Sequence, residues 1–255
     1  QSTTYCALWA RAEHWAHAIR QNGVRQGDIV AVILPRSAEA ITAQLAILRA
    51  GAAFVSLDPE HPIGRLKPTL NAADTCLVIT DDHQILSSLD NPMVTPAALD
   101  RGPGDTRMFS PLPVIRPDDL AYLVFTSGST GQPKPVAIEH WGLPNLALAH
   151  SKLFDLQPSK RMLNFASPAF DAAIGETLIP LATGAAIAIP NATERQPGAP
   201  LEGFIDRAGV TTVTLVPSLL AALDPTAVPG LSTVVAMGEA CPPGIIERWH
   251  TPNRR

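Results

Sequence analysis

The sequence has few of the residues that build disulfide frameworks or nucleic-acid surfaces. Among 255 residues it has three cysteines, Cys6, Cys76 and Cys241. Because this number is odd and the positions lie far apart, neither a disulfide framework nor a metal-binding set is expected. Their apolar surroundings indicate core thiols of a reduced compartment, so we expect a cytoplasmic protein. The formal net charge of −4 provides no basic footprint, and nucleic acid and anionic membrane are not expected as partners.

Long hydrophobic runs are also lacking. The longest candidate, residues 178–189, is short and contains Pro180, Thr183 and Gly184, so no membrane span is expected. No charged segment followed by an apolar one stands at the N-terminus, and we expect no signal peptide. The hydrophobic content of 46% is sufficient for a sizeable core.

Helix and strand patterns alternate along the chain, which predicts an α/β fold with mostly parallel sheets flanked by helices. Strands are expected at 29–34, 53–57, 76–80, 121–125, 161–165, 185–189, 212–216 and 232–236, and helices at 37–50, 62–73, 140–153, 171–182, 200–208 and 217–223, after a first helix that ends near Gly23. The segment 100–119 is rich in Pro, Gly and charge and lacks periodicity. We therefore expect a first α/β lobe at 1–99, a linker or surface excursion at 100–119, and a second α/β lobe at 120–255.

The segment Leu120 to His140, LAYLVFTSGSTGQPKPVAIEH, combines an apolar strand pattern with a loop suited to phosphate. The loop contains four hydroxyl donors, two glycines that let backbone N–H groups approach an anion, and a compact cation. These residues are Thr126, Ser127, Gly128, Ser129, Thr130, Gly131 and Lys134. The spacing differs from that of the P-loop, and no G-x-G-x-x-G fingerprint occurs, so kinase and Rossmann functions lose support. An ordinary polar turn between a strand and a helix is the alternative interpretation.

This segment resembles the phosphate-loop signature of the adenylate-forming enzymes, a superfamily of acyl-CoA ligases, luciferases and the adenylation domains of nonribosomal peptide synthetases. Four further segments resemble adenylation-domain motifs in the same order: Thr4 to Leu8, Leu48 to Pro59, Asn164 to Pro180 and Val234 to Pro242. One position departs from the signature, because Pro135 stands where glycine is usual. Proline fixes φ and removes a backbone donor, so a weaker grip on phosphate is expected.

Asp171 distinguishes the branches of this superfamily. The resemblance implies that an aspartate at this position pairs with the α-ammonium of an amino-acid substrate, whereas acyl- and aryl-acid ligases usually have no carboxylate there. The surrounding residues are apolar (Phe165, Pro168, Phe170, Ile174 and Leu178), and a carboxylate in such a frame is costly unless a cation meets it. The alternative is a helix-start role, since Asp favours that position, and the two roles can coexist.

The resemblance also places the walls of a substrate pocket. They would be Ala172, Gly175, Thr214, Val235 and Met237, with Gly238 and Glu239 in a turn on the nucleotide side. All five wall residues are uncharged, so a neutral and fairly bulky amino acid is expected.

The resemblance implies that the protein is an ATP-dependent amino-acid adenylating ligase. The carboxylate of the amino acid attacks the α-phosphorus of ATP, which gives an aminoacyl-adenylate and pyrophosphate, and the thiol of a phosphopantetheine arm on a peptidyl carrier domain then accepts the acyl group. Thr126 and Lys134 would act as catalytic residues and Thr130 would serve Mg²⁺, since such catalysis rests on positioning and charge neutralisation. A small accessory activator protein is a further partner that the resemblance allows.

Several family motifs normally follow the point at which this sequence ends, so we expect the N-terminal part of an adenylation domain. Two alternatives remain open. One is an acyl- or aryl-acid CoA ligase, against which Asp171 argues. The other is a noncatalytic truncated module that acts as a scaffold, which Pro135 and the missing motifs favour.

Overall fold

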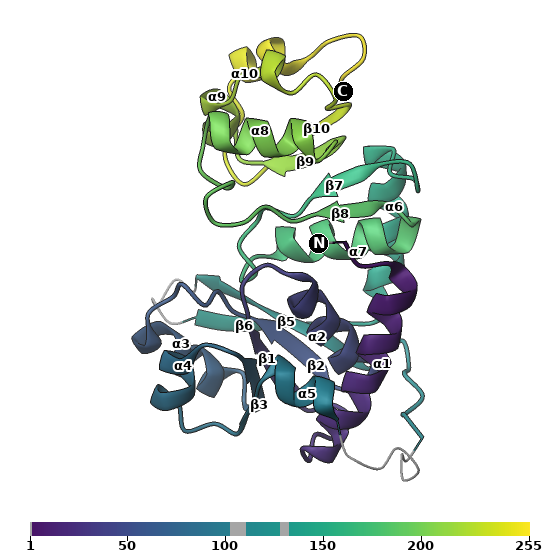
Figure 1. The fold of residues 1–255 in the computed structure, drawn as a ribbon, viewed down its shortest axis with the longest axis vertical. Helices are drawn as coiled ribbons and strands as arrows, with labels where there is room; N and C mark the ends of the chain where they lie inside the picture. The colour runs from purple at the N-terminus through teal and green to yellow at the C-terminus, as the bar shows by residue number, and fades with distance from the viewer. Residues whose placement is uncertain (1, 103–110, 128–132) are drawn as a thin grey trace. The chain divides into compact units, whose positions relative to one another are not determined.

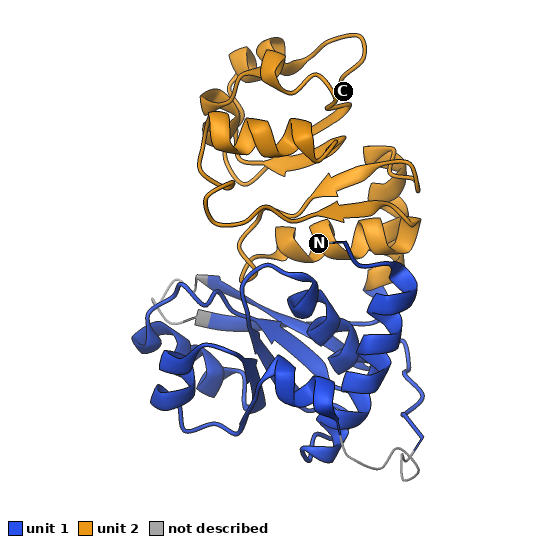
Figure 2. Ribbon diagram, viewed as in Figure 1, with its two compact units in different colours: residues 1–142 blue, residues 143–255 orange. Residues whose placement is uncertain are grey.

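Mostly parallel strands alternate with helices along most of the chain, as the sequence pattern predicts (Figure 1). The structure is a computed structural model that describes residues 2–102, 111–127 and 133–255. The chain divides into two compact units, residues 1–142 and 143–255, shown in blue and orange in Figure 2.

The first unit is built on a six-stranded sheet in the order β4-β3-β1-β2-β5-β6. The strands are β1 (Ile29–Ile33), β2 (Ala53–Ser56), β3 (Thr75–Thr80), β4 (Met93–Val94), β5 (Leu120–Ser127) and β6 (Pro133–Glu139), and the helices are α1 (Tyr5–Gln21), α2 (Ala38–Arg49), α3 (Ile63–Ala72), α4 (His83–Ser88) and α5 (Pro96–Arg101). All pairings are parallel except that of β5 with β6.

Sequence-local signals explain where these helices begin. The hydroxyls of Thr4 and Ser37 accept the N–H groups of Ala7 and Ala40, at 3.2 and 3.1 Å, and so cap α1 and α2. Strand β1 is buried at every position, as expected for a central parallel strand covered on both faces. One of these faces packs against α3 and α4, through Leu66, Leu70 and Ile85.

The β5–β6 hairpin shows where the sequence-based division differs from the structure. Strand β5 pairs in parallel with β2, at Phe54 with Tyr122, and β6 pairs with β5 in the antiparallel direction. The hairpin therefore extends the first sheet, and the two compact units divide after Gly142, not at 119/120 as expected. The reason is that β6, which the sequence reasoning did not predict, returns the chain along β5 before α6 (Gly142–Phe154) begins.

The second unit contains a four-stranded parallel sheet in the order β10-β9-β7-β8. Its strands are β7 (Arg161–Leu163), β8 (Ala186–Ala188), β9 (Thr212–Leu215) and β10 (Thr233–Ala236), and its helices after α6 are α7 (Asp171–Thr183), α8 (Ala199–Arg207), α9 (Pro217–Ala222), the 3₁₀ turn η2 (Pro225–Ala227) and α10 (Pro243–Trp249).

Helices cover both faces of this second sheet. On one face Leu201, Leu220 and Trp249, from α8, α9 and α10, pack against Val213 and other strand residues. On the other face α6 and α7 contribute Phe154 and Ile179, which pack with Met162 and Val235. Successive residues of a strand point to opposite faces of the sheet. A strand residue whose neighbours belong to the core under α8, α9 and α10 therefore faces α7.

The expected fold class is confirmed, but the expectation that the three cysteines are core thiols is wrong. Cys6 is exposed, and Cys76 and Cys241 are partly exposed free thiols. Cys6 lies in the first turn of α1, whose first residues are largely exposed. In the described part of the chain, no helix is both long and apolar enough to cross a membrane.

Candidate active site

Most of the predicted substrate-binding residues lie at one edge of the sheet in the second unit. Strands β7, β9 and β10 run parallel, so their carboxyl ends meet at the same edge, where open α/β sheets bind ligands. The loop after β7 leads to the start of α7 at Asp171, and the segments after β9 and β10 leave the sheet at the same edge.

Asp171 is the first residue of α7, and its side chain is exposed. Its Oδ1 accepts the N–H of Ala172 at 2.8 Å, and a carboxylate in the first turn also suits the helix dipole. The neighbouring Phe170 is 60% exposed. The expectation of a carboxylate enclosed in an apolar frame is therefore wrong for the described structure, because both side chains are open to solvent. An exposed carboxylate held by one backbone N–H keeps acceptor capacity for a cation.

Thr214 and Val235 lie side by side on the sheet. They are register partners on β9 and β10, and Val235 packs on the face that α6 and α7 cover. Because Val213 and Leu215 belong to the opposite core, the alternation along β9 places Thr214 on the α7 face. Thr214 is 7% exposed, and its Oγ1 has no hydrogen-bond partner within the described structure. Thr214 and Val235 thus lie on the same face of the sheet, the face that α6 and α7 cover.

Two further residues of the predicted pocket, Ala172 and Gly175, lie on α7. Both are partly exposed. A Cβ built on Gly175 would have only Ile179 Cδ1 within 4 Å, at 3.5 Å, so the glycine leaves open space along α7.

The turn after β10 carries Met237, Gly238 and Glu239. Met237 is 40% exposed, and its N–H donates to the carbonyl of Leu215 at 3.2 Å. Gly238 has φ +86°, a conformation that favours glycine. The Glu239 carboxylate accepts two hydrogen bonds from Ser218, one from its backbone N–H at 3.0 Å and one from its hydroxyl at 2.9 Å. Glu239 therefore holds the start of α9 against the turn.

Sequence reasoning missed Glu176, a carboxylate at the centre of α7. It is 1% exposed, and its Oε2 accepts the backbone N–H groups of Phe165 and Ala166 at 2.7 and 2.9 Å. The signal was present in the sequence, because Glu176 is the one acidic residue within the apolar stretch Ala172–Ala182, and buried acids are rare unless they are paired.

The described residues of the predicted phosphate loop belong to the first unit, on β5 and β6. Thr126 and Lys134 are register partners across the hairpin, and both are exposed. Gly128, Ser129, Thr130 and Gly131 lie outside the described residues, and of Ser127 only the backbone, at the end of β5, is described. The next described element after β5 is the antiparallel strand β6 and not a helix.

Pro135 has a structural explanation in this hairpin. Pro135 lies on β6, the edge strand of the sheet, opposite Phe125 of β5. Edge strands tolerate proline because one side of the strand has no ladder partner. Pro133 and Pro135 are two residues apart, so both lack an N–H on the same side of β6.

The described residues contain no group of three or more His, Cys, Asp or Glu side chains that could hold a metal ion. The hydroxyl of Thr126 and the ammonium of Lys134 suit phosphate oxygens, and Mg²⁺ commonly binds through substrate phosphates with few protein ligands. Exposed Thr126 and Lys134 therefore fit a Mg²⁺-nucleotide better than a protein-built metal cage.

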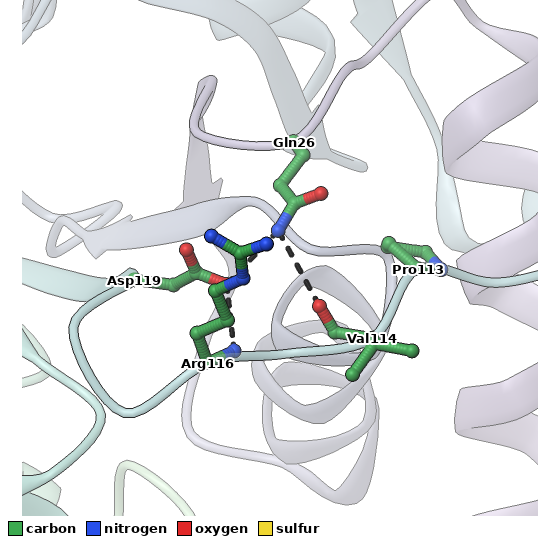
Figure 3. A pocket seen from close by; sticks show the side chains of 5 residues that line it. All are labelled: Gln26, Pro113, Val114, Arg116 and Asp119. Atoms are coloured by element: carbon green, nitrogen blue, oxygen red, sulfur yellow. Dashed lines mark hydrogen bonds between the residues drawn. The ribbon is translucent and has the colours of Figure 1, made fainter.

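A separate surface pocket in the first unit is lined by Gln26, Pro113, Val114, Arg116 and Asp119 (Figure 3). Gln26 Nε2 donates to Asp119 Oδ2 at 2.9 Å, and the Arg116 backbone N–H donates to the same oxygen at 2.8 Å. These hydrogen bonds, with that of Arg116 first, hold the pKa of Asp119 below its ordinary value. The hydrogen bonds of Gln26 join segment 111–119 to the loop before β1. We therefore interpret this pocket as part of the structural framework. None of the predicted site residues lines it.

The fold is that of a two-unit α/β protein, and its motifs resemble those of adenylate-forming enzymes. The model of the AMP-binding enzyme family matches residues 1–255, so the chain belongs to this family. The resemblance to adenylation domains is thereby confirmed.

Relatives of known role agree with this assignment. The chain is 35% identical over 252 residues to bacitracin synthase 3 of Bacillus licheniformis, covering 98% of this chain and 4% of that protein. It is 36% identical to novobiocin biosynthesis protein H of Streptomyces niveus, covering 98% of this chain and 43% of that protein. The N-terminal subdomain of Klebsiella oxytoca NpsA in complex with 3-hydroxybenzoyl-AMSN matches with a TM-score of 0.85 at 26% identity, over 98% of this chain and 63% of that one. The chain thus spans less than half of either curated relative.

Proposed function

We propose that this chain forms part of an adenylation domain that activates an amino acid as aminoacyl-AMP. The substrate carboxylate attacks the α-phosphorus of ATP, and the bond to the departing pyrophosphate breaks. The observation that carries this proposal is the position of Asp171, which begins α7 with an exposed carboxylate at the carboxyl edge of the parallel sheet. An anionic acceptor there suits the α-ammonium of an amino acid.

The remaining pocket residues favour a neutral, bulky side chain. Thr214 and Val235 are register partners on the sheet, and a Cβ added at Gly175 of α7 would have only Ile179 Cδ1 within 4 Å. None of the wall residues is ionisable, so a charged substrate side chain would lose hydration without gaining a partner. Met237 adds an adaptable apolar surface at the end of β10.

Thr126 and Lys134 would contact the phosphates of ATP. Their exposed side chains stand opposite each other on the hairpin, and a hydroxyl beside an ammonium can bind phosphate oxygens and oppose their charge. Mg²⁺ would supply further neutralisation of phosphate charge, with Thr130 proposed as its protein contact.

The product adenylate would be transferred to a peptidyl carrier domain, where the phosphopantetheine thiol attacks the acyl carbon and AMP departs. The family membership and the nonribosomal peptide synthetase relatives support this step. A small accessory activator protein is a further proposed partner.

Activation of an aryl acid is the second candidate function. It is favoured by one observation, the similarity to NpsA, which binds 3-hydroxybenzoyl-AMSN. Asp171 argues against it, since a benzoyl group offers no cation at that position.

The exchange of radiolabelled pyrophosphate into ATP, measured with a panel of amino acids and aryl acids, distinguishes these functions. We expect exchange that depends on one neutral, bulky amino acid and is lost in Asp171→Ala. Exchange supported equally by an acid without an amine would favour the aryl-acid alternative. No exchange with any acid would contradict activity for this chain and favour the noncatalytic module.

A further inference from the structure

The loop that joins β7 to α7 is held by a buried carboxylate. This loop, residues 164–170, leads directly to Asp171. The carboxylate is Glu176, in the second turn of α7, and its Oε2 accepts the N–H groups of Phe165 and Ala166 at 2.7 and 2.9 Å. One oxygen thus ties the beginning of the loop back to the helix that follows it.

Other bonds close the same loop. Asn164 Nδ2 donates to Thr177 Oγ1 at 3.4 Å, and the N–H of Phe170 donates to the carbonyl of Ser167 at 3.0 Å. The first contact is buried and again joins the loop to α7, one residue beyond Glu176. The beginning of the path from β7 to Asp171 is therefore tied to α7, and residues 167–170 close a turn before the helix.

Burying the carboxylate of Glu176 costs desolvation free energy. Glu176 is 1% exposed, and the desolvation of a carboxylate is offset only by strong hydrogen bonds. Bonds from backbone N–H groups to an ionised acceptor are of this charge-assisted kind. A neutral side chain could fill the same volume at a lower desolvation cost. The presence of a carboxylate at this position therefore indicates that its hydrogen bonds to the loop are needed.

We infer that Glu176 is a positioning residue that fixes loop 164–170 and thereby places the carboxylate of Asp171 for the substrate amine. This inference rests on the proposed role of Asp171. Glu176 itself does not contact the substrate, and it acts through the backbone that leads to Asp171. Its loss should therefore reduce amine recognition more than it reduces binding of the acid.

Two ligands separate these effects, L-leucine and 4-methylpentanoate, which is the same acid without the amine. Their affinities are measured by calorimetry on the whole 255-residue chain with Mg²⁺·ATP. In Glu176→Ala we expect the preference for L-leucine to fall about tenfold or more, because small misplacements are costly for oriented groups, while the affinity for 4-methylpentanoate stays nearly constant. Glu176→Gln keeps an acceptor oxygen and should restore most of the preference.

Glu194→Gln is the matched control. The Glu194 carboxylate also accepts a backbone N–H, that of Asn191 at 2.9 Å, but from an exposed turn in the same unit. This variant should bind both ligands as the wild type does. A parallel loss of both affinities in Glu176→Ala, or an unchanged preference for the amine, would overturn the inference.

Amide hydrogen exchange tests the role of Glu176 without a ligand. It therefore separates this role from the proposed amino-acid function. In Glu176→Gln a neutral acceptor replaces the carboxylate, so we expect faster exchange at Phe165 and Ala166, with the β9 amides unchanged. If the wild type shows no preference for the amine, the proposed function is contradicted, and exchange decides the role of Glu176 in the loop. Unchanged exchange at both amides in both Glu176 variants overturns that role, and faster exchange confined to the loop supports it.

Discussion

At the scale of single residues, Gly175 tests the proposed pocket wall most simply. A glycine inside a helix costs roughly 0.5–1 kcal/mol relative to alanine, and a Cβ here would meet only Ile179 Cδ1, at 3.5 Å. We therefore expect Gly175→Ala to raise the free energy of unfolding by about 0.5–1 kcal/mol, measured by urea denaturation. The added methyl group should also weaken binding of a bulky amino acid, because it would enter the open space beside α7 that we propose for the substrate side chain.

Gly203→Ala provides the control for this substitution. Gly203 lies within α8, and its added Cβ would approach only Arg207 Nη1, at 4.0 Å. This variant should gain similar stability and bind ligand as the wild type does. Equal ligand binding by the two variants would contradict the placement of Gly175 in the pocket.

Individual residues also show what sequence could and could not predict. The helix pattern predicts a helix that begins at Asp171, and α7 begins there. Its exposure was not predictable, because a string of apolar neighbours does not reveal which of them face solvent. Phe170 illustrates this, since it is 60% exposed. The hydrogen bonds of Glu176 depend on how the loop folds back onto α7, which no local pattern encodes.

At the scale of elements, α1 and α5 are joined by a cluster of charged and aromatic groups. Arg11 donates to both oxygens of Asp100, at 2.8 and 2.6 Å, and Trp15 Nε1 donates to Oδ1 at 2.7 Å. Arg11 also lies over the ring of Trp15, with its guanidinium carbon 4.8 Å from the centroid. The Arg11 hydrogen bond, and after it that of Trp15, lowers the pKa of Asp100. This cluster fixes a helix that the sequence pattern did not predict.

The lowered pKa of Asp100 predicts a pH-dependent stability. A depressed pKa in the folded state means that the stabilisation is present above the unfolded pKa, about 3.9, and is lost as pH falls through the folded value. We expect Asp100→Asn to lower the free energy of unfolding by about 1 kcal/mol at pH 7, a modest value because the side chain is 42% exposed. The difference between variant and wild type, measured by urea denaturation, should shrink as pH falls from 5 to 3.

Asp90→Asn is the control, since Asp90 pairs with Lys67 on the surface and its side chain is 91% exposed. It should change stability little at either pH. A difference between Asp100→Asn and the wild type that is constant from pH 7 to pH 3 would show that the Asp100 charge does not contribute.

The elements themselves were largely predictable, with instructive exceptions. Helices with clear caps and buried strands such as β1 follow from periodicity and composition. Strand β6 was missed because Pro133 and Pro135 read as loop residues, although an edge strand accepts them. The short elements α4, β4 and α5 were missed because few residues form them.

At the scale of the whole molecule, the proposed chemistry is distributed over the two compact units. Thr126 and Lys134 belong to the first unit, and Asp171 and the pocket walls belong to the second. Each unit has its own buried core, which holds the strands and helices of that unit in place. The curated relatives extend well beyond the matched region, since the chain spans 4% and 43% of the two described above.

The central claim is that this chain carries an amino-acid site that depends on Asp171. The most direct measurement is a thermal-shift screen of the chain with Mg²⁺·ATP and a panel of amino acids, with Asp171→Ala measured beside it. A ligand at about 100 times its Kd stabilises the folded state by about 2.7 kcal/mol. We predict that one neutral, bulky amino acid raises the melting temperature of the wild type and leaves that of Asp171→Ala unchanged. The same shift in both proteins, or no shift with any amino acid, would contradict the account.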